Sequence, residues 1–179
     1  MSDDAAGVPC ALIVMGVSGS GKSTIAARLA ERLNWVYEDG DRFHPPGNVA
    51  KMSAGQPLTD EDRWPWLQAI ANEIDRVCQA GGRVVIASSA LKRAYRDLLI
   101  HGRGDVRIVF LSGTQPLIAD RLAQRKNHFM PPGLLDSQFD DLEMPRPPEN
   151  ALVVNADGTP EELVTAIIHR LDIAAATDS

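Results

Sequence analysis

The sequence predicts an α/β protein in which a five-stranded parallel sheet is covered by helices on both faces. Apolar runs alternate along the chain with segments whose apolar residues recur at helical spacing, as in crossover units between parallel strands. The run Val84–Ala87 is apolar at every position, which is typical of a strand buried on both sides. At 179 residues, the chain is long enough to bury one full core.

The expected strands are Ala11–Met15, Trp35–Glu38, Arg83–Ala87, Arg107–Leu111 and Leu152–Asn155. The expected helices are Lys22–Leu33, Trp64–Ala80, Leu91–Ile100, Gln115–Arg125, Leu134–Leu142 and Pro160–Leu171. Thr59 and Asp62 have the spacing of a capping box, and Gly81-Gly82 is a strong helix stop. Because no repeat or linker interrupts this alternation, we expect a single domain over residues 1–179, with its core from about 9 to about 172.

Composition restricts the possible partners and the compartment. The net charge of −6, from 24 acidic and 18 basic side chains, argues against a nucleic-acid-binding surface. No apolar run approaches the roughly 20 residues that span a bilayer, and the acidic stretch Met1–Gly7 lacks the order of a signal peptide. Cys10 and Cys78, the only cysteines, are expected to be separate buried thiols in a reducing compartment. We therefore expect a cytoplasmic protein with neither nucleic acid nor membrane as partner.

The segment Gly16–Ser23, GVSGSGKS, fits the phosphate-loop pattern G-x-x-x-x-G-K-[S/T] at every fixed position. An expected strand precedes it and an expected helix follows, so backbone N–H groups and the helix N-terminus can point at one anion. Lys22 is expected to reach the β- and γ-phosphates of a nucleoside triphosphate, and the Ser23 hydroxyl to ligate Mg²⁺. The fold class is then a three-layer αβα sandwich of the P-loop NTPase type. The expected nucleotide-binding residues here are Gly16, Val17, Ser18, Gly19, Ser20, Gly21, Lys22, Ser23 and Thr24.

Asp39-Gly40-Asp41 directly follows the second expected strand, at the edge where parallel sheets bind ligands. Phosphoryl transfer needs one acid near the metal and one that orients or deprotonates the attacking hydroxyl. We assign the first role to Asp39 and the second to Asp41, although an acidic turn without a role is the alternative. Ser88 and Ser112 follow the next two strands, where hydrolysing motor ATPases usually carry an acid, and no N-K-x-D segment follows. The chain therefore favours transfer to a bound acceptor.

Basic side chains cluster despite the acidic balance. Lys92 and Arg96 are four residues apart at the start of a helix that follows a buried strand, and Arg63 is expected at the rim of the same crevice. Arg121 and Arg125 have the same spacing and are expected to clamp the adenine face and the transferring phosphates. For each of these residues, a solvated surface charge is the alternative. The irregular stretches 39–59 and 121–148 are the expected substrate flap and lid.

Read together, these segments resemble the gluconate kinases (gluconokinases), a family of small P-loop kinases related to shikimate and nucleoside monophosphate kinases. The resemblance spans nearly the whole chain, in the family's order. The matching segments are MGVSGSGKS at 15–23, DGDRFHP at 39–45, NVAKM at 48–52, GQPLTDEDRWPWL at 55–67, SALKRAYR at 89–96, RLAQRKNHF at 121–129 and SQFDDL at 137–142. It implies ATP- and Mg²⁺-dependent phosphorylation of D-gluconate at its 6-hydroxyl, a homodimer, and a product feeding the pentose phosphate or Entner–Doudoroff routes.

The resemblance also implies which residues form the site. The implied catalytic residues are Lys22, Asp41 and Arg125, with ATP also held by Arg121 and Arg125, and the metal by Ser23 and Asp39. The implied gluconate-binding residues are Asp41, His44, Lys51, Arg63, Ser89, Lys92, Arg96, His128 and Gln138. Arg63, Lys92 and Arg96 offer charge to the carboxylate, while Asp41, His44 and Ser89 offer polar groups to the hydroxyls.

Two alternatives remain at this point. One is a kinase for another small anionic acceptor such as shikimate, although Ala87-Ser88-Ser89-Ala90 stands where shikimate kinases carry a glycine-rich segment. The other is an inactive ATP-binding regulator, which would predict loss of Lys22, Asp39 or Asp41, all of which are present. The chain departs from the family at Asn127, where members often have glycine, and this weakens the assignment of the adjacent His128.

Overall fold

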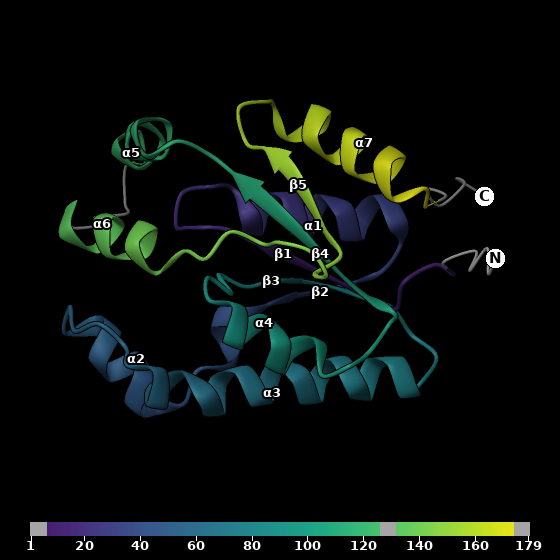
Figure 1. Cartoon of the computed structure of the whole chain (residues 1–179), viewed down its shortest axis with the longest axis horizontal. Coiled ribbons are helices and arrows are strands. Elements are labelled where there is room, and N and C mark those ends of the chain that lie inside the picture. Colours follow the sequence, from purple (N-terminus) through teal and green to yellow (C-terminus); the bar gives the residue numbers. More distant parts are fainter. Residues whose placement is uncertain (1–6, 126–131, 174–179) are drawn as a thin grey trace.

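The computed structural model describes residues 7–125 and 132–173, and within them it shows one parallel sheet of five strands between two layers of helices (Figure 1). The strand order is β2-β3-β1-β4-β5, with every neighbouring pair parallel. The strands are β1 (Ala11–Met15), β2 (Val36–Asp39), β3 (Val84–Ala87), β4 (Val106–Ser112) and β5 (Ala151–Asn155). This architecture confirms the predicted fold class.

Some helices form the crossover connections between the strands, and others lie at one end of the sheet. They are α1 (Lys22–Leu33), the short 3-10 helix η1 (Gly40–Phe43), α2 (Pro46–Ser53), α3 (Asp60–Gln79), α4 (Arg93–Ile100), α5 (Gln115–Ala123), α6 (Pro132–Asp141) and α7 (Pro160–Leu171). None of the helices in the described part of the chain is long and apolar enough to cross a membrane.

The alternation of side chains along the strands divides the core between the two faces of the sheet. In β1, Leu12 and Val14 pack with α1 and α7, whereas Ile13 and Met15 pack with α3 and α4. All five residues of β1 are fully buried, because this central strand pairs with β3 on one side and β4 on the other. The apolar run that predicted a strand covered on both faces is therefore explained by its place in the sheet.

The largest differences from the expected elements lie in the flap and directly after it, whereas the other elements differ by only one or two residues at their ends. The helix expected from Trp64 begins at Asp60, because Thr59 and Asp62 form a capping box and Pro65 is tolerated inside the helix. The segment 39–59, expected to be irregular, contains η1 and α2. The eight-residue α2 begins at Pro46, a position where proline is favoured, but its helical signal is too short to stand out in a Gly- and Pro-rich stretch.

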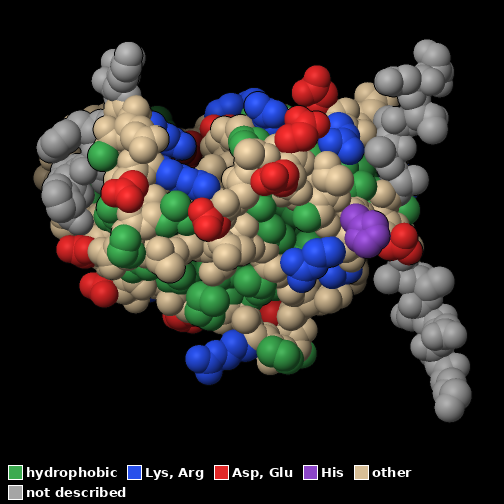
Figure 2. All heavy atoms as spheres, turned by 90° about the horizontal axis from the view of Figure 1, so that it is seen from above, with side chains coloured by type: hydrophobic (Ala, Val, Ile, Leu, Met, Phe, Trp, Pro, Cys, Tyr) green, Lys and Arg blue, Asp and Glu red, His purple; other side chains and the backbone are tan. Residues whose placement is uncertain are grey.

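Because all strands are parallel, their carboxyl ends meet at one edge of the sheet. There α2, α5 and α6 gather, at the left of Figure 1, away from the ends of the chain. Figure 2 shows Lys and Arg side chains gathered beside a hollow on the side where α5 and α6 lie. This edge is where ligands bind in open α/β sheets.

Candidate active site

The loop between β1 and α1 leaves the N-terminus of a helix open to an anion. Gly21 precedes α1 with φ 92°, a left-handed conformation that favours glycine. Since glycine has no side chain to cap the helix, the first N–H groups of α1 stay available to a ligand. Behind the loop, Val17 packs against Ile118 and Leu122 of α5. The loop is thus packed against α5 on one side, while the N-terminus of α1 stays accessible to a ligand.

Lys22, the first residue of α1, lies among the charged groups predicted for phosphoryl transfer. Burial lowers its pKa below the ordinary lysine value, and Arg125 acts in the same direction. The carboxylates of Asp41 and Asp39 act in the opposite direction. Lys22 therefore lies within the range of charge interaction of Asp41, Asp39 and Arg125, and the roles of these residues in phosphoryl transfer stay predictions.

The turn Asp39-Gly40-Asp41 is held by contacts that require its sequence. Asp39 Oδ1 accepts a hydrogen bond from the backbone N–H of Asp41 at 3.0 Å, so one carboxylate sets the direction of the next residue. A Cβ on Gly40 would lie 2.5 Å from the carbonyl oxygen of Ala87 on β3, which leaves room for glycine alone. Trp66 Nε1 donates to the Gly40 carbonyl at 2.7 Å from the buried side. Asp41 itself remains exposed at the edge of the sheet.

His44 lies directly after this turn with its ring fixed on two sides. The ring stacks on Trp66 with 4.2 Å between ring centroids and 14° between planes. Its Nδ1 is 3.2 Å from Nδ2 of Asn48, the buried polar residue of α2. Burial lowers the pKa of His44 and Arg63 adds to this, against an opposing effect of Asp41. His44 is therefore neutral at pH 7 and close to the predicted base.

Two of the three cations predicted for the substrate carboxylate converge on one tyrosine. Arg63 Nη1 donates to the Tyr95 hydroxyl at 2.9 Å, and that hydroxyl donates to Asp60 Oδ1. Lys92 Nζ donates to the same Asp60 oxygen at 3.0 Å. Arg63 and Lys92 also lie 5.5 and 5.7 Å from the centroid of the Tyr95 ring. Burial, followed by the bond to Asp60, raises the pKa of Tyr95, so its hydroxyl remains a neutral bridge between the charged groups.

The sequence and the fold of this chain were compared with those of known proteins. Residues 12–145 match the AAA domain family. The chain is 45% identical to a gluconokinase of Gluconobacter oxydans, covering 89% of this chain and 90% of that one. It is 44% identical to a probable gluconokinase of mouse, covering 91% and 98%. A solved gluconokinase of Sinorhizobium meliloti superposes with a TM-score of 0.84 at 42% identity, covering 92% and 93%.

The chain belongs to the gluconokinase family. A shikimate kinase of Bacteroides thetaiotaomicron superposes with a TM-score of 0.64 at only 20% identity, which shows the shared P-loop kinase fold and nothing more. The predicted family and the predicted fold are both confirmed.

One expectation of the gluconokinase resemblance is wrong. Arg96, expected to bind the substrate carboxylate, is 0% exposed. Its Nε and Nη2 donate to the two carboxylate oxygens of Glu149 at 2.6 and 3.2 Å, and its Nη1 donates to the carbonyls of Ala90 and Leu91. Arg96 lies one turn after Lys92 on α4, and that turn carries it from the crevice into the protein interior. It cannot serve as a cation for a bound sugar acid.

Lys51 and Ser89 were also predicted to bind the substrate. Lys51 lies in an ion pair, and Ser89 lies half-buried in a loop. Lys51 Nζ is 2.8 Å from Asp62 Oδ2, so it joins α2 to the first turn of α3. Ser89 is half-buried in the loop between β3 and α4, next to the buried Ser88. The substrate roles of Lys51 and Ser89 stay predictions.

Residues of the expected lid contact the phosphate loop. Gln138 of α6 accepts a hydrogen bond from the Ser18 backbone N–H at 2.6 Å, and its amide donates to the Ser18 hydroxyl at 2.9 Å. Arg121 of α5 donates to the carbonyls of Ser20, at 3.5 Å, and Ala156. Gln138 was predicted to bind gluconate, and its contact here is with the nucleotide loop. His128 and its neighbour Asn127 lie outside the described residues.

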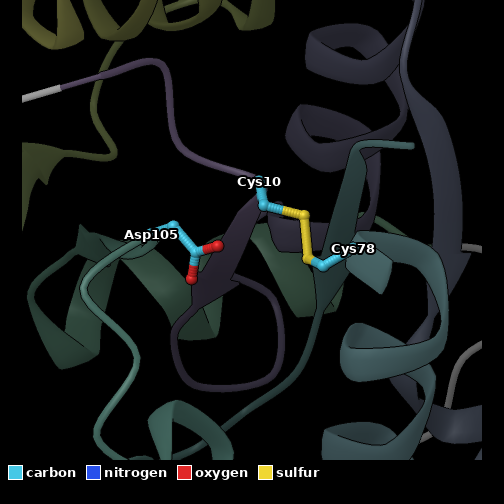
Figure 3. Close-up of side chains that lie close together, drawn as sticks. All are labelled: Cys10, Cys78 and Asp105. Carbon is cyan, nitrogen blue, oxygen red and sulfur yellow. A yellow bond between two sulfur atoms is a disulfide. The ribbon is translucent and has the colours of Figure 1, made fainter. Parts of the chain in front are cut away.

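The two cysteines form a disulfide, which corrects the expectation of separate thiols (Figure 3). Cys10 directly precedes β1 and Cys78 lies in the last turn of α3, with Cα atoms 5.9 Å apart and a sequence separation of 68. Both are half-buried. The Asp105 carboxylate is adjacent, but sulfurs bonded to each other are not thiolate ligands, so we assign no metal site to this group. The inference of a reducing compartment rested on free thiols and no longer stands.

Three residues that shape the site were missed by the sequence analysis: Tyr95, Asn48 and Asp60. Tyr95 belongs to the segment SALKRAYR that carried the gluconokinase resemblance, and it lies three residues after Lys92, on a neighbouring position of the helix surface. Asn48 lies within α2, which the sequence analysis missed, and Asp60 is the first residue of α3, which begins earlier than expected. Correct bounds for these two helices would have placed both residues beside His44 and Arg63.

Proposed function

We propose that this protein transfers the γ-phosphoryl group of ATP to the 6-hydroxyl of D-gluconate, giving 6-phosphogluconate and ADP. One structural observation carries the proposal: Lys22 and Asp41 interact at the mouth of the phosphate loop, while Arg63 and Lys92 converge nearby on the acceptor side. Relatives that cover most of the chain are named gluconokinases, which supports the same acceptor.

The nucleotide half of the site fits ATP and Mg²⁺ by its donor set. The N–H groups at the start of α1 and the Lys22 ammonium are donors for phosphate oxygens. The Ser23 hydroxyl and the second carboxylate oxygen of Asp39 are the hard oxygen ligands that Mg²⁺ prefers. These two residues would hold Mg²⁺, which would supply positive charge against the charge that develops on the transferring phosphoryl group. Arg125, close enough to affect Lys22, would stabilise the transferring group, and Arg121 would border the nucleotide.

On the acceptor side, Asp41 orients the attacking hydroxyl and receives its proton. The hydroxyl oxygen forms a bond to the γ-phosphorus while the bond between that phosphorus and the β–γ bridging oxygen breaks, and ADP leaves. Asp39 fixes the backbone of Asp41 through the 3.0 Å hydrogen bond, so the base is positioned before substrate arrives.

Arg63 and Lys92 are the groups we assign to the carboxylate of the sugar acid. The Arg63 side chain is 20% exposed, and Asp141 of α6 approaches its Nη1 only to 3.8 Å. A bound carboxylate would make shorter, charge-assisted hydrogen bonds to the same guanidinium. A neutral aldose offers no charge to these cations, so it lacks the charge-assisted hydrogen bonds that a carboxylate would make with them.

The test compares kcat/KM for D-gluconate and D-glucose, which both carry a primary 6-hydroxyl. We expect a strong preference for gluconate in the wild type. Arg63→Leu is expected to raise the KM for gluconate by roughly 10- to 100-fold, the effect of losing a charged hydrogen bond, with the KM for ATP changed at most a few-fold. Arg93→Leu is the matched control, because the Arg93 side chain on α4 is 42% exposed and pairs with Asp97.

Comparable kcat/KM values for gluconate and glucose in the wild type would overturn the proposal. An equal effect of Arg63→Leu and Arg93→Leu on the KM for gluconate would remove Arg63 from the binding site while leaving the activity in place.

We also infer that the protein is a homodimer, as the resemblance to gluconate kinases implied, and that it is cytoplasmic, as its composition and N-terminal sequence indicated. Light scattering coupled to size-exclusion chromatography gives the mass directly, and a monomer across the micromolar range would contradict this. Fractionation of cells that express the full chain tests the compartment.

A further inference from the structure

His44 is held so firmly that the orientation of its ring is determined. Trp66 covers one face of the imidazole at a centroid distance of 4.2 Å, and Trp66 is itself anchored by its bond to the Gly40 carbonyl. The Nδ1 edge of the ring faces Asn48 at 3.2 Å. The direction of the ring, and therefore of Nε2, is set by its neighbours.

The hydrogen bonds of Asn48 determine which atom of its amide faces His44. Asn48 is 5% exposed, and its Nδ2 is 2.8 Å from the backbone carbonyl oxygen of Asp62. A carbonyl oxygen only accepts hydrogen bonds, so the amide nitrogen, and not the amide oxygen, must face it. The same nitrogen carries a second hydrogen, and His44 Nδ1 lies within hydrogen-bond distance of it.

An amide nitrogen donates hydrogen bonds and does not accept them. His44 Nδ1 must therefore accept, which requires that it carry no proton. In a neutral imidazole the proton is then on Nε2. The contacts of Asn48 thus select one of the two neutral tautomers of His44.

We propose that Asn48 is a positioning residue that holds His44 as the Nε2–H tautomer, so that His44 donates a hydrogen bond to an oxygen of the acceptor and takes no proton from it. The part that concerns the acceptor rests on the proposed function; the tautomer does not. His44 then contributes to binding the sugar acid, and Asp41 is left as the group that receives the proton of the attacking hydroxyl.

The charges around His44 are consistent with this division. Asp41 of η1 and Arg63 of α3 are the charged groups that act on the ring among the described residues, and Asn48 of α2 is neutral. Protonation of Nδ1 would also place two donors against each other at the Asn48 contact. A neutral ring with a fixed donor is therefore the stable state at pH 7.

The tautomer is tested on the wild-type protein alone, without substrate, by the ¹⁵N chemical shifts of the imidazole nitrogens. His44→Gln identifies the His44 signals among those of the four histidines. Above the pKa of His44 we expect an unprotonated Nδ1 and a protonated Nε2. A protonated Nδ1 would overturn the proposal whether or not gluconate is the substrate.

Asn48→Asp tests the functional consequence. A carboxylate at this position accepts from Nδ1–H, so we expect the neutral ring to carry its proton on Nδ1 and the pKa of His44 to rise. Nε2 then loses its hydrogen on deprotonation, and the KM for gluconate should rise about two- to tenfold as the pH passes this pKa. In the wild type, Nε2 of His44 carries a hydrogen in both the neutral and the protonated ring. We therefore expect no such rise in the KM for gluconate.

Val49→Ala, at an exposed neighbour on α2, is the control and should follow the wild type. An Asn48→Asp protein with the wild-type tautomer, or with a KM–pH profile parallel to the wild type, would overturn the positioning role. If the tautomer changes as expected but gluconate is not phosphorylated, the proposed function fails and the role of Asn48 in fixing His44 stands.

Discussion

Arg96 and Glu149 form a two-point ion pair in the protein interior, with side-chain exposures of 1% and 3%. The pair joins α4 to the segment between α6 and β5. Arg96 also donates to the carbonyl of Ala90, a buried residue whose φ of 43° lies in the left-handed region. Such a conformation costs a non-glycine residue about 1 kcal/mol or more. Arg96 therefore stabilises the loop that carries Ser89 and Lys92, although it does not reach the crevice.

Replacing Arg96 by leucine should act on stability. The change leaves the Glu149 carboxylate buried without its partner, and breaking a buried pair in this way costs about 3–5 kcal/mol in the free energy of unfolding. Replacing both residues by leucine should recover much of this loss, because no charge is then left unpaired. Chemical denaturation of the two variants measures the difference. A fully stable Arg96→Leu protein with a selectively raised KM for gluconate would instead support the earlier expectation.

The contrast between Lys92 and Arg96 shows what the sequence could and could not predict. Helical spacing indicates that Lys92 and Arg96 are one turn apart. It does not indicate which of the two faces the crevice, because that depends on the position of Glu149 in the tertiary structure. The phosphate loop could be predicted because all its signals are local: fixed glycines, a preceding strand and a following helix. The disulfide could not, since Cys10 and Cys78 meet only after the sheet has formed.

Asp62 should contribute to acid sensitivity. The hydrogen bond from Lys51 and then that from the Thr59 backbone lower its pKa to about 2. Because the folded-state pKa lies below the unfolded value of about 4, the stability that ionised Asp62 contributes is fully present above about pH 4 and is lost as the pH falls toward 2. Asp62→Asn should flatten the dependence of unfolding free energy on pH in this window. Curves for the two proteins that run parallel between pH 4 and 2 would contradict the assignment.

The disulfide should stabilise the fold. It closes a long loop, since Cys10 and Cys78 have a sequence separation of 68, and a loop of this length is worth up to about 4 kcal/mol in the chain-entropy model. Reducing agent should therefore lower the melting temperature by several degrees. The double variant Cys10→Ser, Cys78→Ser should melt lower and show no response to the reductant. Two reactive thiols in the folded protein purified without reductant would show that the bond does not form.

Lys22→Ala should abolish most of the turnover while leaving the fold intact. The ammonium compensates the charge that develops on the transferring phosphate, and loss of such a group lowers kcat by roughly 10²-fold or more. Circular dichroism and the melting temperature are expected to change little, because the conformation of the loop depends mainly on its glycines. Normal turnover with Mg-ATP would place the phosphates elsewhere.

Asp41→Asn separates the base from the metal ligand. An asparagine keeps the shape of the turn but cannot take a proton, so kcat should fall by roughly 10²- to 10⁴-fold while the KM for ATP stays within a few-fold. Asp39→Asn should instead raise the Mg²⁺ concentration needed for half-maximal activity, because we expect its carboxylate to support the metal through water. Equal loss of ATP binding in Asp41→Asn would move this carboxylate onto the metal and exchange the roles of the two acids.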